Sequence, residues 1–374
     1  MKIRAAVLDT RGMDRPYKDT RPLQIEELEL DPPGDGEVLV EIKASGLCHS
    51  DLSVIDGNRP RPTPMALGHE SAGVVAEIGP NVMDLAPGDH VVSTLVPSCG
   101  HCVPCASGRP MLCEPGVSAN TAGTLYSGKF ALHRNGKHIH HHIGISAFAE
   151  YAVIARNSLI KVERSLPLVE VAMFGCAVMT GVGAVINTAG VKAGSTVAVI
   201  GLGGVGLNAI LGARLAGARR IVALDILDHK LALARQLGAT DTFNAGDADC
   251  VEAVRDATSG GVEYAIDTAG AGPALQMAWD ITRRGGTTVT AGLPHPDTHL
   301  AVPAVMMVGE ERTLKGSYGG SSVPVRDIPQ YLELYQRGIL PVDSLLSEQL
   351  TLDEINEGFD RLADGATIRQ MIVF

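Results

Sequence analysis

Short apolar runs, separated by turns rich in glycine and proline, occupy the first part of the chain. The runs are AAVL, EVLVEIKASGL, SAGVVAEIG, HVVSTL and AEYAVIA, and the turns between them include DPPGDGE, NRPRPTP and APGD. Strands this short, at this spacing, are typical of all-β or β-rich domains. The pattern therefore predicts a β-rich domain over roughly the first 175 residues.

From Ser195 onward, apolar strands alternate with amphipathic helices. The predicted strands are STVAVIG, RRIVALDI, EYAIDTAG and TTVTAGL, and the predicted helices are GLGGVGLNAILGARLAG, KLALARQLGA and GPALQMAWDITRRGG. Alternation of this kind indicates βαβ units and a parallel sheet. After about residue 318 the pattern becomes helical and irregular, and the chain ends in the strand-like MIVF. The fold class is therefore α/β, with a doubly wound parallel-sheet domain beside the β-rich one.

The length of 374 residues suggests two domains. The 31 Lys and Arg against 42 Asp and Glu give a net charge of -11, which argues against nucleic acid or an anionic membrane as a partner. The N-terminus lacks the apolar core of a signal peptide, so a cytoplasmic protein is expected. Between Lys192 and Arg214 lie 21 uncharged residues, but six are glycines, which disfavours a membrane span.

A glycine motif lies between the first strand and first helix of the alternating region. Gly201, Gly203 and Gly206 form G-x-G-x-x-G in this context, which is typical of a turn that binds a dinucleotide pyrophosphate. Asp225 ends the next strand, 19 residues after Gly206, where a carboxylate accepts the ribose hydroxyls of NAD and repels the 2'-phosphate of NADP. The motif predicts NAD; a glycine turn that binds no cofactor is the alternative.

Four of the seven cysteines are close together in the sequence. Cys99, Cys102, Cys105 and Cys113 are spaced C-x2-C-x2-C-x7-C within 15 residues. Four thiolates saturate a tetrahedral zinc and leave no open position, so a structural zinc is predicted. An iron–sulfur cluster is the competing interpretation. Cys250 has no partner and is expected not to be a ligand.

Cys48, His69 and Cys176 are far apart in the sequence, and taken singly each is more typical of a buried core residue than of a ligand. However, GHESAGVVAEIGPNV fits G-H-E-x2-G-x5-G-x2-V, and GLCHSD, the four-cysteine loop and FGCAVMTG accompany it in order. With these motifs the whole chain resembles the zinc-dependent alcohol dehydrogenases of the medium-chain superfamily. Its long layout is similar to that of glutathione-dependent formaldehyde dehydrogenase.

This resemblance implies that Cys48, His69 and Cys176 hold a catalytic zinc whose fourth position is open. It places Asp51 beside His69 as an orienting carboxylate and Glu70 behind the metal. Ser50 would take the proton of the alcohol hydroxyl. In many relatives the proton relay ends at a histidine, but the corresponding residue here is Ser53.

Further roles follow from the same resemblance. Cofactor contacts besides Asp225 are expected at Gly201, Gly203, Gly204, Val205, Gly206, Lys230, His49, Thr180 and Arg369. The expected substrate-pocket residues are Arg59, Leu95, His142, Ile143 and Leu293. The run from His138 to His142 is interpreted as a stretch that leads towards the pocket, rather than as a third metal site.

The resemblance also implies the architecture. A GroES-like catalytic domain would comprise residues 1–178 and 318–374 and carry both zinc sites, and a Rossmann domain would comprise residues 179–317. Relatives associate through the edge strands of their Rossmann sheets, so a homodimer through TTVTAGL is expected, with a homotetramer as the alternative.

The implied reaction is hydride transfer between an alcohol and NAD, giving an aldehyde or ketone. The mainly apolar pocket residues favour a medium-sized primary alcohol, aromatic or allylic. Oxidation of an S-hydroxymethyl thiol adduct of formaldehyde is the alternative, disfavoured because Arg59 and Arg61 stand where such enzymes carry acids, and Val117 where they carry an arginine. A zinc-stabilised NAD-binding protein without activity is the alternative from another class.

Overall fold

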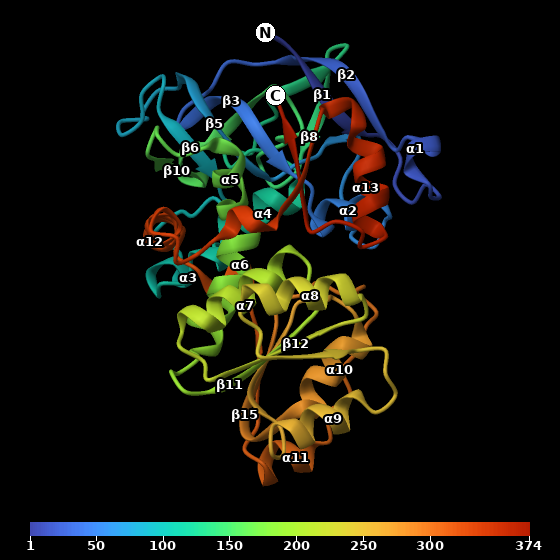
Figure 1. Cartoon of the computed structure of the whole chain (residues 1–374). Helices are drawn as coiled ribbons and strands as arrows, with labels where there is room; N and C mark the ends of the chain where they lie inside the picture. The colour runs from blue at the N-terminus through green and yellow to red at the C-terminus, as the bar shows by residue number, and fades with distance from the viewer. The chain divides into compact units, whose positions relative to one another are not determined.

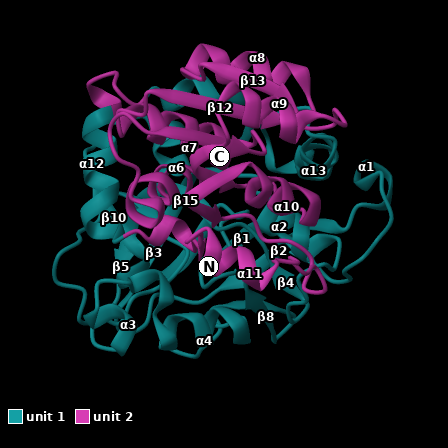
Figure 2. Ribbon diagram, turned by 90° about the horizontal axis from the view of Figure 1, so that it is seen from below, with its two compact units in different colours: residues 1–176, 323–334, 341–374 teal, residues 177–322, 335–340 magenta.

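The computed structural model describes residues 1–374 and divides them into two compact units (Figure 2). Unit 1 comprises residues 1–176, 323–334 and 341–374, and unit 2 comprises residues 177–322 and 335–340. The boundaries at 176/177 and 322/323 lie within five residues of the expected limits, whereas residues 335–340, expected in the catalytic domain, group with unit 2. Unit 2 is thus inserted into unit 1, whose last segments return to it after the insertion.

One part of unit 1 is a closed barrel with the strand order β1 (Lys2–Leu8), β2 (Leu23–Leu30), β7 (Leu132–Arg134), β8 (Lys137–His141) and β4 (Met65–Ala66). Strand β1 is buried on both faces. Ile3, Ala5 and Val7 pack in one core cluster, and Ala6 and Leu8 pack in another. Because neighbouring residues of a strand point to opposite faces, β1 joins these two cores.

Two of the candidate metal ligands, Cys48 and His69, lie next to strand ends of the other sheet of unit 1. Its order is β10 (Leu159–Val162), β6 (His90–Ser93), β5 (Glu70–Ile78), β3 (Glu37–Gly46), β18 (Arg369–Val373) and β17 (Leu346–Leu350), and β9 (Tyr151–Ala155) also pairs with β3. The C-terminal strand β18 lies beside β3, with Met371 opposite Gly46. The helices of this unit are α1 (Tyr17–Thr20), α2 (His49–Ile55), α3 (Val103–Ala106), α4 (Glu114–Ala122), α5 (Leu168–Ala172), α13 (Ile355–Ala363) and most of α12 (Pro324–Gln336).

Unit 2 is built on a six-stranded sheet, visible in the yellow-to-orange part of Figure 1. Its order is β13 (Asp241–Asn244), β12 (Arg220–Asp225), β11 (Thr196–Ile200), β14 (Val262–Asp267), β15 (Thr282–Thr290) and β16 (Thr313–Gly316), and every pair is parallel. The helices are α6 (Ala177–Gly183), α7 (Gly204–Leu215), α8 (Asp228–Leu237), α9 (Cys250–Ala257), α10 (Gly272–Ile281) and α11 (Ala304–Gly309). This strand order is that of a doubly wound dinucleotide-binding sheet, which confirms the predicted fold class.

Two details of unit 2 differ from the sequence prediction. The helix expected over residues 272–286 ends at Ile281, and Thr282 begins β15. Gly285 adopts a left-handed φ of 69°, which the helix cannot continue through. The segment TTVTAGL was expected at the sheet edge, and this is wrong, because β15 pairs with β14 on one side and with β16 on the other.

No single helix is long and apolar enough to cross a membrane. One pair of consecutive helices, 168–175 and 177–189, reaches that length and composition only when the two are taken together.

Candidate active site and metal centres

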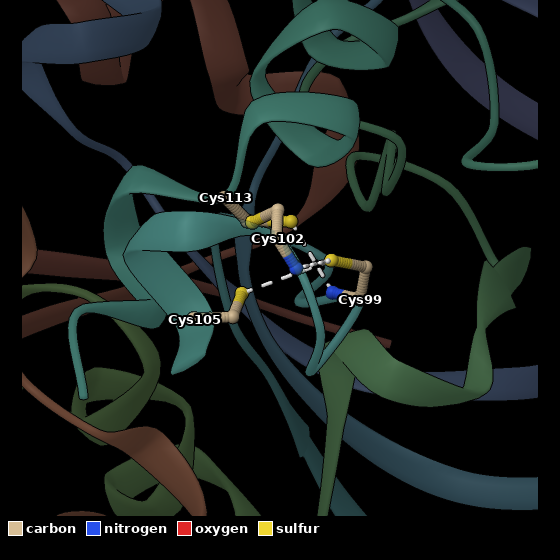
Figure 3. Close-up of side chains that lie close together, drawn as sticks. All are labelled: Cys99, Cys102, Cys105 and Cys113. Atoms are coloured by element: carbon tan, nitrogen blue, oxygen red, sulfur yellow. Dashed lines mark hydrogen bonds between the residues drawn. The ribbon is translucent and has the colours of Figure 1, made fainter. Parts of the chain in front are cut away.

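The four clustered cysteines turn their sulfurs towards one another in the lobe that carries α3 and α4 (Figure 3). All four sulfurs lie within 4.8 Å of one another, and Cys99 Sγ is 3.9 Å from Cys105 Sγ. Tetrahedral zinc with bonds of about 2.3 Å holds its sulfurs about 3.8 Å apart. The spacing fits a single ion, whereas an iron–sulfur cluster places several metal atoms between its cysteines.

Backbone donors prepare this lobe for thiolates. The N–H groups of Cys102 and His101 point at Cys99 Sγ at 3.2 and 3.4 Å, and the N–H of Cys99 points at Cys113 Sγ at 3.2 Å. Burial opposes ionisation of Cys99, but the N–H groups of His101 and Cys102, with the nearby side chains of Cys102 and Cys113, outweigh it and lower the pKa of the thiol to about 6. Burial raises the pKa of Cys105 and Cys113. The lobe is therefore suited to hold a structural zinc.

Three distant segments bring the second ligand set together. Cys48 stands at the start of α2, His69 directly precedes β5, and Cys176 follows the short turn Met173–Gly175. Their ligand atoms lie within 4.8 Å of one another, with Cys176 Sγ 3.5 Å from His69 Nε2. All three residues are buried. The contact with Cys176, followed by that with His69, lowers the pKa of Cys48 well below its ordinary value.

Tight packing fixes this geometry. A Cβ on Gly175 would lie 2.0 Å from the carbonyl oxygen of Ser93, so the turn before Cys176 must run against β6. A Cβ on Gly68 would lie 2.4 Å from the backbone nitrogen of Phe148. Glycine is therefore required beside two of the three ligands.

Asp51 lies beside His69, as expected. His69 Nδ1 is 3.2 and 3.1 Å from the two carboxylate oxygens of Asp51, and the N–H of Gly68 donates to the first of them at 3.2 Å. Burial opposes ionisation of Asp51, but His69 and His142 outweigh it and hold its pKa well below the ordinary range. An ionised Asp51 fixes the proton on His69 Nδ1 and leaves Nε2 free to bind a metal.

Glu70 has a partner that the sequence did not reveal. Its carboxylate accepts a hydrogen bond from the guanidinium of Arg369, and both side chains are buried. Burial by itself would lower the pKa of Arg369, but Glu70 and the thiolates of Cys48 and Cys176 raise it. Arg369, expected from the resemblance to contact the cofactor pyrophosphate, is thus ion-paired behind the metal ligands in unit 1.

His142 also lies against the metal ligands. It is 2% exposed, its Nδ1 is 3.0 Å from Asp51 Oδ1, and its ring meets that of His69 edge to face at 5.4 Å. The neighbouring histidines lie elsewhere: His138 stacks on Phe130 at 4.1 Å, and His140 contacts both rings. The histidines of this run therefore lie in different surroundings.

The first turn of α2 carries the candidate proton acceptor. Ser50 is half-buried two residues after Cys48, and His49 is exposed. Ser53, one turn on, donates its hydroxyl to the carbonyl oxygen of His49 at 2.8 Å. This hydroxyl is therefore occupied within the helix, as is common for serine in helices.

The glycine turn of unit 2 has the shape of a pyrophosphate cradle. Gly201 adopts φ +85°, and a Cβ there would lie 2.7 Å from Ala269 Cα. A Cβ on Gly206 would lie 1.9 Å from the carbonyl oxygen of Gly201, so α7 and the turn are in close contact. Gly203 has nothing within 4 Å of its would-be Cβ, which leaves open space at the start of α7, where Gly204 and Val205 form the first turn. A dinucleotide fits this arrangement.

Asp225 lies at the carboxyl end of β12, next to this turn. Its carboxylate accepts N–H groups from Leu202 at 2.7 Å and from Leu227 at 3.0 Å. Two backbone donors hold the acid in place beside the turn. Thr180 in α6 and Lys230 in α8 are each less than a tenth exposed.

The expected pocket residues fall in both units. Leu95 and Ile143 are buried in unit 1, where Arg59 is half-buried. Leu293 belongs to unit 2 and is 46% exposed.

Comparisons with known proteins agree with both parts of the chain. Residues 34–164 match the alcohol dehydrogenase GroES-like domain, and residues 204–337 match the zinc-binding dehydrogenase domain. The chain belongs to the zinc-dependent alcohol dehydrogenases of the medium-chain superfamily. This confirms the resemblance drawn from its motifs.

Relatives of this zinc-dependent alcohol dehydrogenase match it over its whole length. The NDMA-dependent alcohol dehydrogenase of Amycolatopsis methanolica is 39% identical, over 100% of this chain and 99% of that one. The crystal structure of an alcohol dehydrogenase zinc-binding domain protein from Burkholderia ambifaria has a TM-score of 0.93 at 38% identity, and that of benzyl alcohol dehydrogenase from Acinetobacter calcoaceticus has 0.92 at 34%. Each covers 100% of this chain and 99% of its own.

Proposed function

We propose that this enzyme transfers hydride between an alcohol and NAD, giving an aldehyde or ketone, in the cytoplasm. The observation that carries the proposal is the convergence of Cys48, His69 and Cys176 as three buried ligands. Three protein ligands are typical of a catalytic zinc, whereas four are typical of a structural one. The Gly201–Gly206 turn and Asp225 supply the features that NAD binding requires.

The residues around the three ligands have separate roles in the proposed reaction. Zinc, when bound, supplies a Lewis acid that lowers the pKa of an alcohol hydroxyl, and the two thiolates offset its formal charge. Asp51 holds His69 in one tautomer and orientation. Ser50 accepts the hydroxyl proton, and because Ser53 is bonded to His49, we propose that the proton leaves Ser50 through water.

For the substrate we propose a medium-sized primary alcohol, aromatic or allylic. The expected pocket residues Leu95 and Ile143 are apolar and buried in unit 1, and a relative at 34% identity is named benzyl alcohol dehydrogenase. The test measures initial rates of NADH formation by zinc-loaded protein with ethanol, a long aliphatic alcohol, benzyl and cinnamyl alcohols, a secondary alcohol, and formaldehyde with and without glutathione. We expect the highest kcat/KM for benzyl or cinnamyl alcohol.

Two results would contradict this proposal. Activity confined to formaldehyde with glutathione would favour the thiol-adduct reaction, despite Arg59, Arg61 and Val117. If no alcohol gave a measurable rate of NADH formation, in protein that retains both zinc ions and binds NAD, the result would favour a zinc-stabilised NAD-binding protein without activity.

A second candidate concerns the electron acceptor. The relative that is 39% identical over the whole chain is named NDMA-dependent, so a requirement for NDMA is the alternative to simple turnover with free NAD. Parallel assays with NAD alone, NDMA alone and both separate the two candidates. Turnover with NAD alone supports the first, and turnover only when NDMA is present supports the second.

Replacing Asp225 should relax the choice of cofactor. In Asp225→Gly we expect the KM for NAD to rise about tenfold or more and the preference for NAD over NADP to fall, because the carboxylate that would accept the ribose hydroxyls and repel a 2'-phosphate is gone. Steady-state kinetics with both cofactors measure the effect, and Asp228→Gly, in the first turn of α8, is the matched control. An unaltered cofactor preference would place the ribose elsewhere.

For the assembly we propose a homodimer through β16, the edge strand of the unit 2 sheet. All four residues of this strand are exposed, Leu314 among them, and Val305 and Val308 of α11 are 78% and 82% exposed. An exposed edge strand near apolar side chains is a template for pairing with another chain.

Charges on this face should break the proposed dimer. In Val308→Glu/Leu314→Glu we expect sedimentation or light scattering to report a monomer, whereas Val325→Glu, an exposed site on α12, leaves the dimer intact. An unchanged mass for the double variant would exclude β16 as the interface, and a wild-type mass of four chains would favour the homotetramer.

A further inference from the structure

One buried carboxylate of this enzyme faces two histidines. Asp51 is 0% exposed, and its carboxylate lies 3.1 Å from His69 Nδ1 and 3.0 Å from His142 Nδ1. A metal-ligating histidine ordinarily has one partner on its second ring nitrogen. The additional histidine beside that partner needs an explanation of its own.

The cluster of Asp51, His69 and His142 is unsuited to a further metal ion, although its ligand atoms lie within 4.8 Å of one another. His69 Nε2 faces Cys176 at 3.5 Å and is the atom available to the zinc. Nδ1 of the same ring therefore carries the proton and has no lone pair for a second ion. Asp51 is therefore a hydrogen-bond acceptor surrounded by possible donors, and the three side chains do not form a ligand set for a further ion.

The backbone holds His142 in this place. The N–H of His142 donates to the carbonyl oxygen of Ala66 at 3.2 Å and to Ser146 Oγ at 3.0 Å, and Ser146 Oγ donates to the same carbonyl at 2.8 Å. The N–H of Ala147 donates to the carbonyl oxygen of Gly68 at 3.1 Å. The turn from His142 to Ala147 is thus fastened to the segment that leads directly into His69.

The same turn contains backbone strain. Ile143 and Ser146 adopt φ of 55° and 57°, a left-handed conformation that costs a non-glycine residue of the order of 1 kcal/mol or more. Such strain persists only where the surrounding contacts over-determine the conformation. Here those contacts fix His142 against Asp51 in a buried site.

We propose that His142 is a positioning residue for the catalytic zinc ligand His69, acting through Asp51. In this proposal the N–H at His142 Nδ1, 3.0 Å from Asp51 Oδ1, restrains the carboxylate that contacts His69 Nδ1. Without this donor, a buried carboxylate oxygen loses a partner and Asp51 gains freedom to turn away from His69. The proposal rests on the zinc site of the proposed function, but it concerns retention of the metal rather than turnover.

The experiment compares three variants of the zinc-loaded full-length protein. His142→Leu removes the donor, His142→Asn retains an N–H donor at the position of Nδ1, and His138→Leu changes an exposed histidine of the same run. The readout is the rate at which each of the two zinc ions passes to a chromogenic chelator. The visible spectrum of cobalt substituted at the catalytic site is a second readout, since it reports the ligand geometry.

We expect His142→Leu to release one zinc equivalent 10- to 100-fold faster than wild type and to leave the four-cysteine equivalent unchanged. His142→Asn should recover most of the loss, and His138→Leu should match wild type. Equal release rates in His142→Leu and wild type would overturn the proposal. So would equal acceleration of both zinc ions, which indicates general loss of folding, or failure of His142→Asn to rescue. A protein that shows the expected release rates but oxidises no alcohol would contradict only the proposed function.

Discussion

Replacing Cys176 with serine should remove one of two zinc ions and reduce alcohol oxidation at least 10³-fold. The side chain is one of three buried ligands, and a neutral serine hydroxyl replaces its thiolate poorly at zinc. The four-cysteine lobe has its own complete ligand set and retains its ion. Metal analysis and initial rates on the same preparation measure both effects.

Cys250→Ser is the matched control for this prediction. Cys250 is also a buried cysteine, 2% exposed, but it packs in the apolar core of unit 2 and belongs to no cluster of ligands. It should retain two zinc ions and most of the activity. If Cys176→Ser kept two zinc ions, or if Cys250→Ser lost one, the assignment of the catalytic ligands would be wrong.

The sequence predicted those features of the fold that depend on local pattern. Strand β11, the glycine turn and the helix after it follow from periodicity and from the backbone demands of Gly201 and Gly206. The end of α10 was missed because no glycine or proline stands between Ile281 and Gly285 to mark it, and pairing of Thr282 with Val262 prevails over helix formation there. Which strand forms the edge of a sheet is decided by pairing between distant strands. Local sequence pattern carries no information on that pairing, so the edge position expected for TTVTAGL was wrong.

In the candidate site too, features formed by residues close in sequence were predictable, and contacts between distant residues were not. The four cysteines form their cluster within one short segment, so their spacing alone predicts it. The contacts of Arg369 with Glu70, 299 residues apart, and of His142 with Asp51 depend on strand packing. Buried charged groups are nearly always paired, and that rule was the one available signal that Glu70 and Asp51 need partners, although it names none of them.

Replacing Ser50 with alanine should slow alcohol oxidation 10²- to 10⁴-fold while both zinc ions remain bound. Ser50 stands two residues after Cys48 in the first turn of α2 and belongs to neither ligand set. Its hydroxyl is the proton acceptor of the proposed mechanism, and a positioned general base contributes rate factors of this size. The loss should shrink at high pH, because hydroxide from bulk water then takes over the role of the missing acceptor. Steady-state kinetics across a pH series, with metal analysis of each preparation, test this.

Ser53→Ala provides the control within the same helix. It removes a hydroxyl that donates to the carbonyl oxygen of His49 at 2.8 Å, so any general disturbance of α2 is at least as large as in Ser50→Ala. Because we propose that the proton leaves Ser50 through water, Ser53→Ala should keep turnover within a few-fold of wild type. Equal losses in the two variants would mean either that the relay passes through Ser53 or that the helix as a whole is disturbed, and a pH-independent loss in Ser50→Ala would remove this residue from proton transfer.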